Sequence, residues 1–288
     1  DGMQGDLHWT YGGREEGGPR GGGPESGHFN TRGFLYYAWM SGCPAPVKVA
    51  RAMADLVHYK ITEDVFPQYE FGRMSGHNIQ VLTDGYRITG EKKYLEAAAR
   101  IIDRSASDNW PFGAGLPAEE GFTGWQGAIL LREVIRFIEL FETEFGQTPE
   151  RALECLLLGL RLYNCHAWNE QNGRYATDIQ ADGSLVHFER EPWWDLKILE
   201  MLAWGAKWLT DAEERQLTLA RARRNFDVAC GMFLKGRPRQ PTYWNAKGAT
   251  AGCGNGPGFL ALERLLTERN KRKGRSRSNA SNNRRRKG

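Results

Sequence analysis

The chain has 288 residues, of which 40% are hydrophobic and 26% charged, the composition of an ordinary globular protein. No apolar run approaches the roughly 18 residues that cross a bilayer, so the sequence predicts no membrane partner. The formal net charge of +4 arises at the C-terminus, because ten Lys and Arg residues and no acidic residue follow Glu268. Residues 1–268 are therefore mildly acidic, which argues against a nucleic-acid-binding body.

Residues 1–27 contain ten glycines between polar and charged residues. Glycine loses the most conformational entropy on ordering, so we expect a loop or an extended arm here. Tyr11, with His8 and Trp9, supplies the only side chains in this arm that suit contact with another surface. The arm has no basic and apolar leader, so no signal peptide is visible. A start at Asp1, inside a polar segment, leads us to expect a fragment of a longer protein.

A helical pattern follows the arm. Apolar residues recur at three-and-four spacing in four successive segments, near residues 34–42, 49–56, 79–88 and 95–102. The segments repeat in pairs, because Gly27-His28 and Gly76-His77 each precede an apolar helix that ends in Ser/Thr-Gly. The two Gly-His pairs lie 49 residues apart, and a fixed period of this length indicates stacked helical hairpins. Gly42 and Gly90 are expected to be left-handed C-caps.

Weaker copies of the hairpin continue the pattern. A third pair is predicted over 124–145 and 149–168, and a fourth over 191–209 and 211–234. Thr210-Asp211 before two glutamates is a plausible helix start. Between the pairs, residues 173–177 and 185–188 predict one short β-hairpin across the Asp182-Gly183 turn. A last, unpaired helix is predicted from Gly258 to about Arg269.

The C-terminal segment, residues 270–288, is almost entirely Lys, Arg, Ser, Asn and Gly. It has too few apolar residues to fold alone, so we expect a disordered basic tail. Nucleic acid is an expected partner only through this tail, and the tail has no aromatic residue to stack on bases.

The sequence predicts neither a metal nor a cofactor. None of the five cysteines forms a Cys-x-x-Cys pair, and no histidine lies at zinc-finger spacing. The glycine-rich arm lacks the Lys-Ser/Thr of a phosphate-binding loop, and no Gly-x-Ser-x-Gly nucleophile motif occurs.

The second hairpin resembles a known superfamily most closely, in the stretch Gly76-His77 followed by Asp84-Gly85-Tyr86-Arg87-Ile88-Thr89-Gly90-Glu91-Lys92-Lys93-Tyr94-Leu95. This motif resembles the hairpin motif of the six-hairpin (α/α) toroid carbohydrate-active enzymes. Within that superfamily it is most similar to the helical domain of exo-acting rhamnogalacturonan lyase-like proteins. The resemblance implies an all-α toroid over residues 28–269. About four and a half of the six hairpins of such a ring are visible, with one β-hairpin insertion, so the ring is expected to be incomplete.

The resemblance also implies a cleft at one end of the ring, where loops lead into the inner helices. Five such segments can be named: 25–30, 73–78, 121–126, 189–195 and 255–258. If the hairpins repeat, these segments converge at the opening of this one cleft. The expected catalytic residues are His28, His77, Arg73 and Asp195. The expected substrate-binding residues are Asn30, Asn78, Trp125, Gln126, Trp193, Trp194, Tyr11 and Trp110.

Two chemistries suit these residue types. β-Elimination from a uronate needs a positive group against the carboxylate, here Arg73, and a base for the C5 proton, here His28 or His77. A helix-start histidine that bonds a neighbouring loop and a surface arginine are the structural alternatives. Glycoside hydrolysis instead needs two carboxylates beside the bond. The candidates for that pair are Glu25, Glu119, Glu120, Glu191 and Asp195.

The tryptophans favour a sugar ligand, because sugars lay apolar C–H faces on flat rings. Core packing is the common alternative for any one of them. We therefore expect a carbohydrate-active enzyme domain that binds an acidic polysaccharide or oligosaccharide, with a polysaccharide lyase favoured. A glycoside hydrolase and a non-catalytic glycan-binding or scaffold toroid are the alternatives. A secreted or periplasmic location would suit such a substrate.

Overall fold

The computed structural model describes residues 31–63, 72–106, 122–180, 182–187, 193–235, 259–260 and 264. These residues are mostly helical with a small β insertion, as the sequence predicts. The chain divides into two compact units, residues 1–162 with 179–184 (unit 1) and residues 163–178 with 185–288 (unit 2). Each unit is described by itself.

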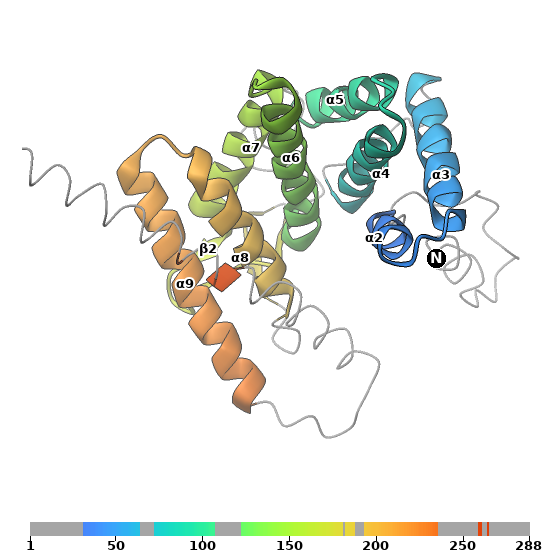
Figure 1. Cartoon of the computed structure of the whole chain (residues 1–288). Coiled ribbons are helices and arrows are strands. Elements are labelled where there is room, and N and C mark those ends of the chain that lie inside the picture. Colours follow the sequence, from blue (N-terminus) through green and yellow to red (C-terminus); the bar gives the residue numbers. More distant parts are fainter. Residues whose placement is uncertain are drawn as a thin grey trace, which may run out of the picture. The chain divides into compact units, whose positions relative to one another are not determined.

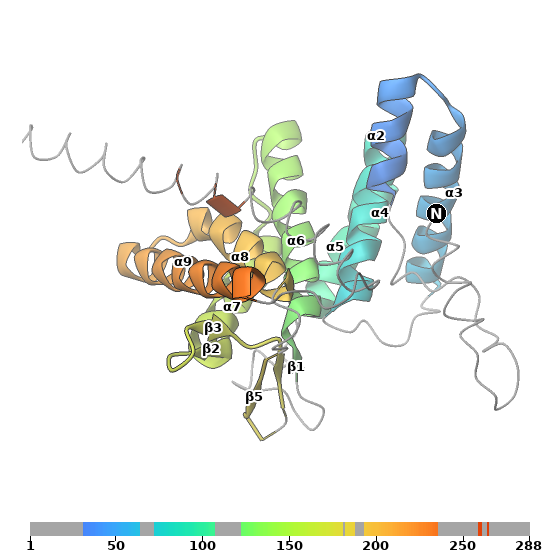
Figure 2. The same cartoon turned by 90° about the horizontal axis from the view of Figure 1, so that it is seen from below.

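The described helices of unit 1 form three consecutive hairpins. They are α2 (Arg32–Ser41), α3 (Ala45–Thr62), α4 (Arg73–Thr89), α5 (Lys93–Ser105), α6 (Gly124–Phe145) and α7 (Glu150–Leu162), with the short strand β1 (Phe122–Thr123) before α6. The first helices pack side by side in the order α2, α4, α6, and the second helices in the order α3, α5, α7. Figures 1 and 2 show α2 beside α3 and α4. Two sets of neighbouring helices are what a stack of hairpins produces.

Glycines end the first helices of the first two hairpins. Gly42 has φ 70° and its N–H donates to the carbonyl of Ala38, while Gly90 has φ 73° and its N–H donates to the carbonyl of Tyr86. This left-handed conformation is open to glycine at little cost. Both predicted C-caps are confirmed.

The start of α4 differs from the prediction. The Gly76-His77 pair was expected at the beginning of an apolar helix, but α4 begins at Arg73, so the pair lies in its second turn. Gly76 has a packing role instead, because a Cβ there would lie 2.9 Å from the Cα of Leu130 on α6. The sequence alone does not distinguish a glycine that starts a helix from one that lets two helices approach closely. The structure assigns the second role to Gly76.

Most of α4 is buried although many of its residues are polar. Every residue from Ser75 to Gly85 is buried except His77, which is half-buried. The buried set includes the polar residues Ser75, Asn78, Gln80, Thr83 and Asp84. Burying polar groups costs free energy unless they find partners, so a polar helix at the centre of a unit marks a place for function.

Unit 2 is built on two helices beside a small sheet. They are α8 (Trp193–Gly205), extended by the 3₁₀ turn η3 (Ala206–Trp208), and α9 (Ala212–Lys235), which pack together (Figure 1). The predicted start of α9 is confirmed, because Asp211 Oδ1 accepts hydrogen bonds from the N–H groups of Glu213 and Glu214. A π-helical turn, η2 (Tyr163–Ala167), precedes strand β2 (Trp168–Asn169).

The β insertion contains two hairpins rather than the one predicted. Strand β3 (Arg174–Tyr175) pairs antiparallel with β2, so it does not pair across the Asp182-Gly183 turn. Strands β4 (Asp178–Ile179) and β5 (Leu185–Val186) flank that turn, where Gly183 has φ 82°. The turn was predicted correctly, but the first hairpin was missed because β2 was assigned to the preceding helix.

Several predictions fall outside the described residues. They concern the arm over 1–27, the tail over 270–288 and most of the helix from Gly258, of which Phe259, Leu260 and Arg264 are described as helical. Within the described residues, no helix is long and apolar enough to cross a membrane.

Candidate functional site

The starts of α4 and α6 lie together in unit 1. A Cβ at Gly72, just before α4, would lie 3.1 Å from Gln126 Oε1, and the Arg73 guanidinium carbon lies 5.8 Å from the centre of the Trp125 ring. Gly76 then meets Ile129 and Leu130, so the two helices run in the same direction. Two of the five predicted segments therefore meet, and they bring Arg73, Trp125 and Gln126 to one place.

His77 and Asn78 continue this region one turn into α4. His77 lies four residues after Arg73, which puts both side chains on one face of the helix. Asn78 is 1% exposed, and its Oδ1 has no hydrogen-bond partner in the part of the chain that the structure describes. A cationic group, an aromatic ring and an amide thus meet at the first turns of two parallel helices, with an imidazole one turn further along α4.

Further along α4, Asp84 is fully buried and held by the start of α2. Its Oδ2 accepts a hydrogen bond of 2.8 Å from the Thr31 hydroxyl, and its Oδ1 accepts one of 2.9 Å from Arg32 Nε. Arg87 Nη1 lies 3.4 Å from the same Oδ1. Burial raises the pKa of Asp84, and the negative charge of Glu133 adds to that rise against the opposing effect of Arg32.

Glu133 on α6 is the second buried carboxylate of this cluster. Its Oε1 lies 2.6 Å from Arg136 Nη1 and 3.2 Å from Arg132 Nε. Burial alone would raise the pKa of Glu133, but Arg136, Arg132 and Arg32 together hold it below its ordinary value. His77 is among the groups that lower it, so the imidazole and this carboxylate interact electrostatically.

Arg32 connects the two carboxylates. Its Nη2 lies 2.9 Å from Asp84 Oδ1 and 3.9 Å from Glu133 Oε2, so the carboxylate oxygens are separated by at most the sum of these distances. We name the group formed by Arg32, Asp84, Arg87, Arg132, Glu133 and Arg136 the α2–α4–α6 ion cluster. Three consecutive first helices contribute to it, and two carboxylates with opposite pKa shifts are characteristic of acid–base sites.

In unit 2, Asp195 is held inside the fold. The side chain is fully buried, and its Oδ2 accepts a hydrogen bond of 2.9 Å from Arg174 Nε, which is also buried. This environment favours a structural ion pair over the predicted catalytic role. Trp194 is half-buried, with Lys197 Nζ 4.6 Å from its ring centre, and Trp193 is the first residue of α8.

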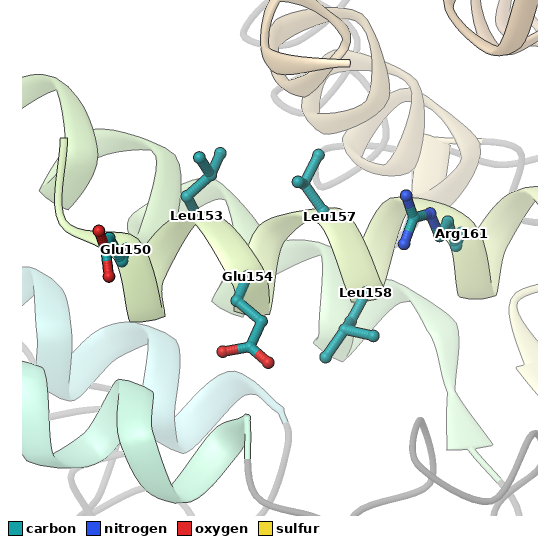
Figure 3. Close-up of a pocket in the computed structure, with 6 residues that line it drawn as sticks. All are labelled: Glu150, Leu153, Glu154, Leu157, Leu158 and Arg161. Carbon is teal, nitrogen blue, oxygen red and sulfur yellow. The ribbon is translucent and has the colours of Figure 1, made fainter. Parts of the chain in front are cut away.

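The remaining predicted site residues lie outside the described residues: His28, Asn30, Tyr11 and Trp110. The predicted convergence of five segments therefore reduces, within unit 1, to the meeting of segments 73–78 and 121–126. A pocket of about 340 Å³ lies elsewhere in unit 1, along α7 (Figure 3). Leu153 and Leu157 project from one side of α7, and none of the predicted site residues lines this pocket.

Sequence reasoning missed the acidic members of the ion cluster as site candidates. Asp84 was visible only as part of the motif Asp84-Gly85-Tyr86-Arg87. Glu133 interrupts the apolar run from Ile129 to Ile135, and a carboxylate inside such a run is a detectable sign of a buried charge. Arg32 gave no sign, because its partners lie far away in the sequence.

The described residues contain no cluster of metal-binding side chains. No group of three or more His, Cys, Asp and Glu side chains among them is placed to hold a metal ion. Cys43, Cys155, Cys165 and Cys230 are all reduced. No protein-family model matches the chain, and no curated protein sequence matches it.

Proposed function

We propose that the chain is a carbohydrate-active domain of the (α/α) toroid type that cleaves an acidic polysaccharide by β-elimination at a uronate. The observation that carries the proposal is the contact between Arg73 and Trp125 at the paired starts of α4 and α6, with His77 one turn deeper. Two sets of helices in hairpin order, with α4 and α6 running parallel, support the toroid expectation.

The residues suit the steps of the reaction. Trp125 offers a flat ring to the apolar face of a sugar, and Arg73 offers a planar fork to its carboxylate. Drawing charge from the carboxylate makes the C5 proton more acidic. His77 then takes that proton, the C4–O bond breaks as a C4–C5 double bond forms, and solvent protonates the departing oxygen.

The test is an ultraviolet assay for the unsaturated uronide, with polygalacturonate and other uronic-acid polysaccharides as substrates. We expect absorbance to rise with the wild type and His77→Ala to slow the rise by about 10²–10⁴-fold, the usual worth of a general base. His58→Ala is the matched control, because His58 lies on α3 against Tyr94, away from the paired helix starts. Equal rates for the two variants would remove His77 from the mechanism.

Glycoside hydrolysis is a second candidate, favoured by one observation. Asp84 and Glu133 are neighbouring carboxylates whose pKa values are moved in opposite directions, as a proton donor and a carboxylate base require. This chemistry predicts new reducing ends without ultraviolet absorbance. Asp84→Asn and Glu133→Gln would then abolish release, while Asp55→Asn on α3 would not. Binding without either product would favour a non-catalytic glycan-binding domain.

A further inference from the structure

The α2–α4–α6 ion cluster holds more positive than negative charge. Asp84 and Glu133 supply two carboxylates, whereas Arg32, Arg87 and Arg132 alone supply three guanidiniums. Arginine stays ionised under all ordinary conditions, so the imbalance does not disappear by titration. A surplus of partly buried charge is costly, which makes the cluster a favourable place for an additional anion.

The exposure of the side chains shows from which side an anion would arrive. The carboxylates of Asp84 and Glu133 are 0% and 1% exposed, while the arginine side chains range from 13% for Arg32 to 32% for Arg87. The guanidiniums therefore lie between the buried acids and solvent. The acids fix the arginines in place, so a ligand meets donors that are already oriented.

We propose that the α2–α4–α6 ion cluster is a binding site for the carboxylate group of an acidic sugar, with Arg132 and Arg136 of α6 as its principal donors. Their four-residue spacing places both on one side of α6, flanking Glu133. Guanidinium forks match carboxylates through paired hydrogen bonds. The inference rests on the proposed function for the sugar, and it adds the residues that recognise its charge.

The position of the cluster sets the size of the ligand. Glu133 lies eight residues after Trp125 on α6, which is about 12 Å along the helix axis. A ligand that touches both the Trp125 ring and the arginines must therefore be longer than one sugar ring. Oligogalacturonate is expected to bind more tightly than galacturonic acid.

The experiment compares oligogalacturonate with its fully methyl-esterified form, which has the same sugars without the charge. Binding to the full chain is measured by calorimetry. We expect the wild type to prefer the acid form, and Arg132→Gln or Arg136→Gln to reduce that preference about tenfold, the usual worth of a charged hydrogen bond. Arg51→Gln is the matched control, because Arg51 is an exposed arginine of α3 paired with Glu91. It is expected to leave the preference unchanged.

A second measurement does not depend on how well the variants fold. Phenylglyoxal modifies accessible arginines, and peptide mass spectrometry locates them in the wild type. Acid oligomer, and not the methyl ester, is expected to protect Arg132 and Arg136 while Arg51 continues to react. Equal affinity for the two oligomers, a preference that survives both substitutions, or no selective protection would overturn the proposal. Displacement of the oligomer by millimolar inorganic sulfate would reassign the site to small oxyanions.

The two proposals fail in different ways. Turnover of a uronate polysaccharide with no effect of Arg132→Gln on the preference for acid leaves the lyase standing and removes this binding site. Selective binding of the acid oligomer without any product leaves the binding site standing and removes the lyase.

Discussion

The two units bury charge in different ways. In unit 1, two carboxylates are shared among four arginines from α2, α4 and α6, and all the arginines are partly exposed. In unit 2, the side chains of Arg174 and Asp195 form an ion pair and are 2% and 0% exposed. A sealed pair is not accessible to a ligand, whereas a cluster at the edge of solvent is. Exposure therefore distinguishes a structural ion pair from a candidate binding site.

The polar groups around the two ion sites differ as well. In unit 2, Asn164 accepts a hydrogen bond from the Tyr175 hydroxyl and donates one to Thr218 Oγ1, which links the π-helical turn to β3 and α9. In unit 1, α4 and α6 are joined by close packing at Gly76. Near its ion pair, unit 2 therefore joins its elements through neutral hydrogen bonds. Unit 1 joins α4 and α6 through close packing of their backbones.

The largest effect is expected from breaking the sealed pair. Asp195→Ala leaves the buried Arg174 guanidinium without its carboxylate, which should lower the free energy of unfolding by about 3–5 kcal/mol. Urea denaturation followed by circular dichroism measures the loss. The double variant Arg174→Met with Asp195→Leu is the control and should regain most of the stability. An Asp195→Ala protein as stable as the wild type would show that the pair is not sealed.

The close contact in unit 1 should be nearly as sensitive. Gly76→Ala places a Cβ 2.9 Å from the backbone of Leu130, so α4 and α6 must separate, at a cost of about 3 kcal/mol, the upper part of the usual range for overpacking. Gly33→Ala in α2 is the matched control, because a Cβ there meets nothing within 4 Å. It should stabilise the protein by up to about 1 kcal/mol. Thermal unfolding of both variants checks the opposite signs.

The hydrogen-bond network of unit 2 should respond more weakly. Thr218→Val keeps the shape of the side chain but removes the acceptor of the buried Asn164 amide, at a cost of about 1–2 kcal/mol. Thr143→Val is the control, since Thr143 is an exposed threonine of α6 that bonds its own helix. If both variants unfold at the same urea concentration, the network contributes nothing beyond ordinary packing.

The pH dependence of stability tests the charge state of Glu133. Its folded pKa lies below the unfolded value of 4.5, so its contribution to stability is present above that pH and is lost as the pH falls through the folded pKa. Glu133→Gln should therefore flatten the decline of stability in acid. Glu154→Gln, at a half-exposed position on α7, should not. Parallel declines in the wild type and Glu133→Gln would contradict the lowered pKa.

Local features of the fold were predictable, while contacts between helices were not. Gly42, Gly90 and Asp211 mark helix ends through backbone chemistry that a single sequence carries. The boundaries of α6 were also predicted, because Gly124 and Phe145 bound one long apolar pattern. Gly76 was wrongly assigned to a helix start, because a glycine is required there by the close approach of the neighbouring helix α6. Arg32 and Asp84 are 52 residues apart, and nothing local joins them.

The candidate site was predictable to the same extent. Segments 73–78 and 121–126 were expected to meet because the hairpins repeat, and Arg73, Trp125 and Gln126 do lie together. In the sequence, Asp195 looked equally suitable as a site residue. Its burial and its pairing with Arg174 depend on the folded arrangement of unit 2, which the sequence does not reveal. A repeat thus predicts which segments become neighbours, but it does not predict which carboxylates are covered.

The short connections within the hairpins also bear on how the chain folds during synthesis. Only Gly90, Glu91 and Lys92 separate α4 from α5, so that hairpin closes through local contacts, which form quickly. Each hairpin is complete soon after its second helix leaves the ribosome. The bond between Arg32 and Asp84 spans 52 residues and waits for the following hairpin. Nascent chains that end near residue 63 are therefore expected to hold α2 and α3 without this ion pair, and the pair to form once α4 has emerged.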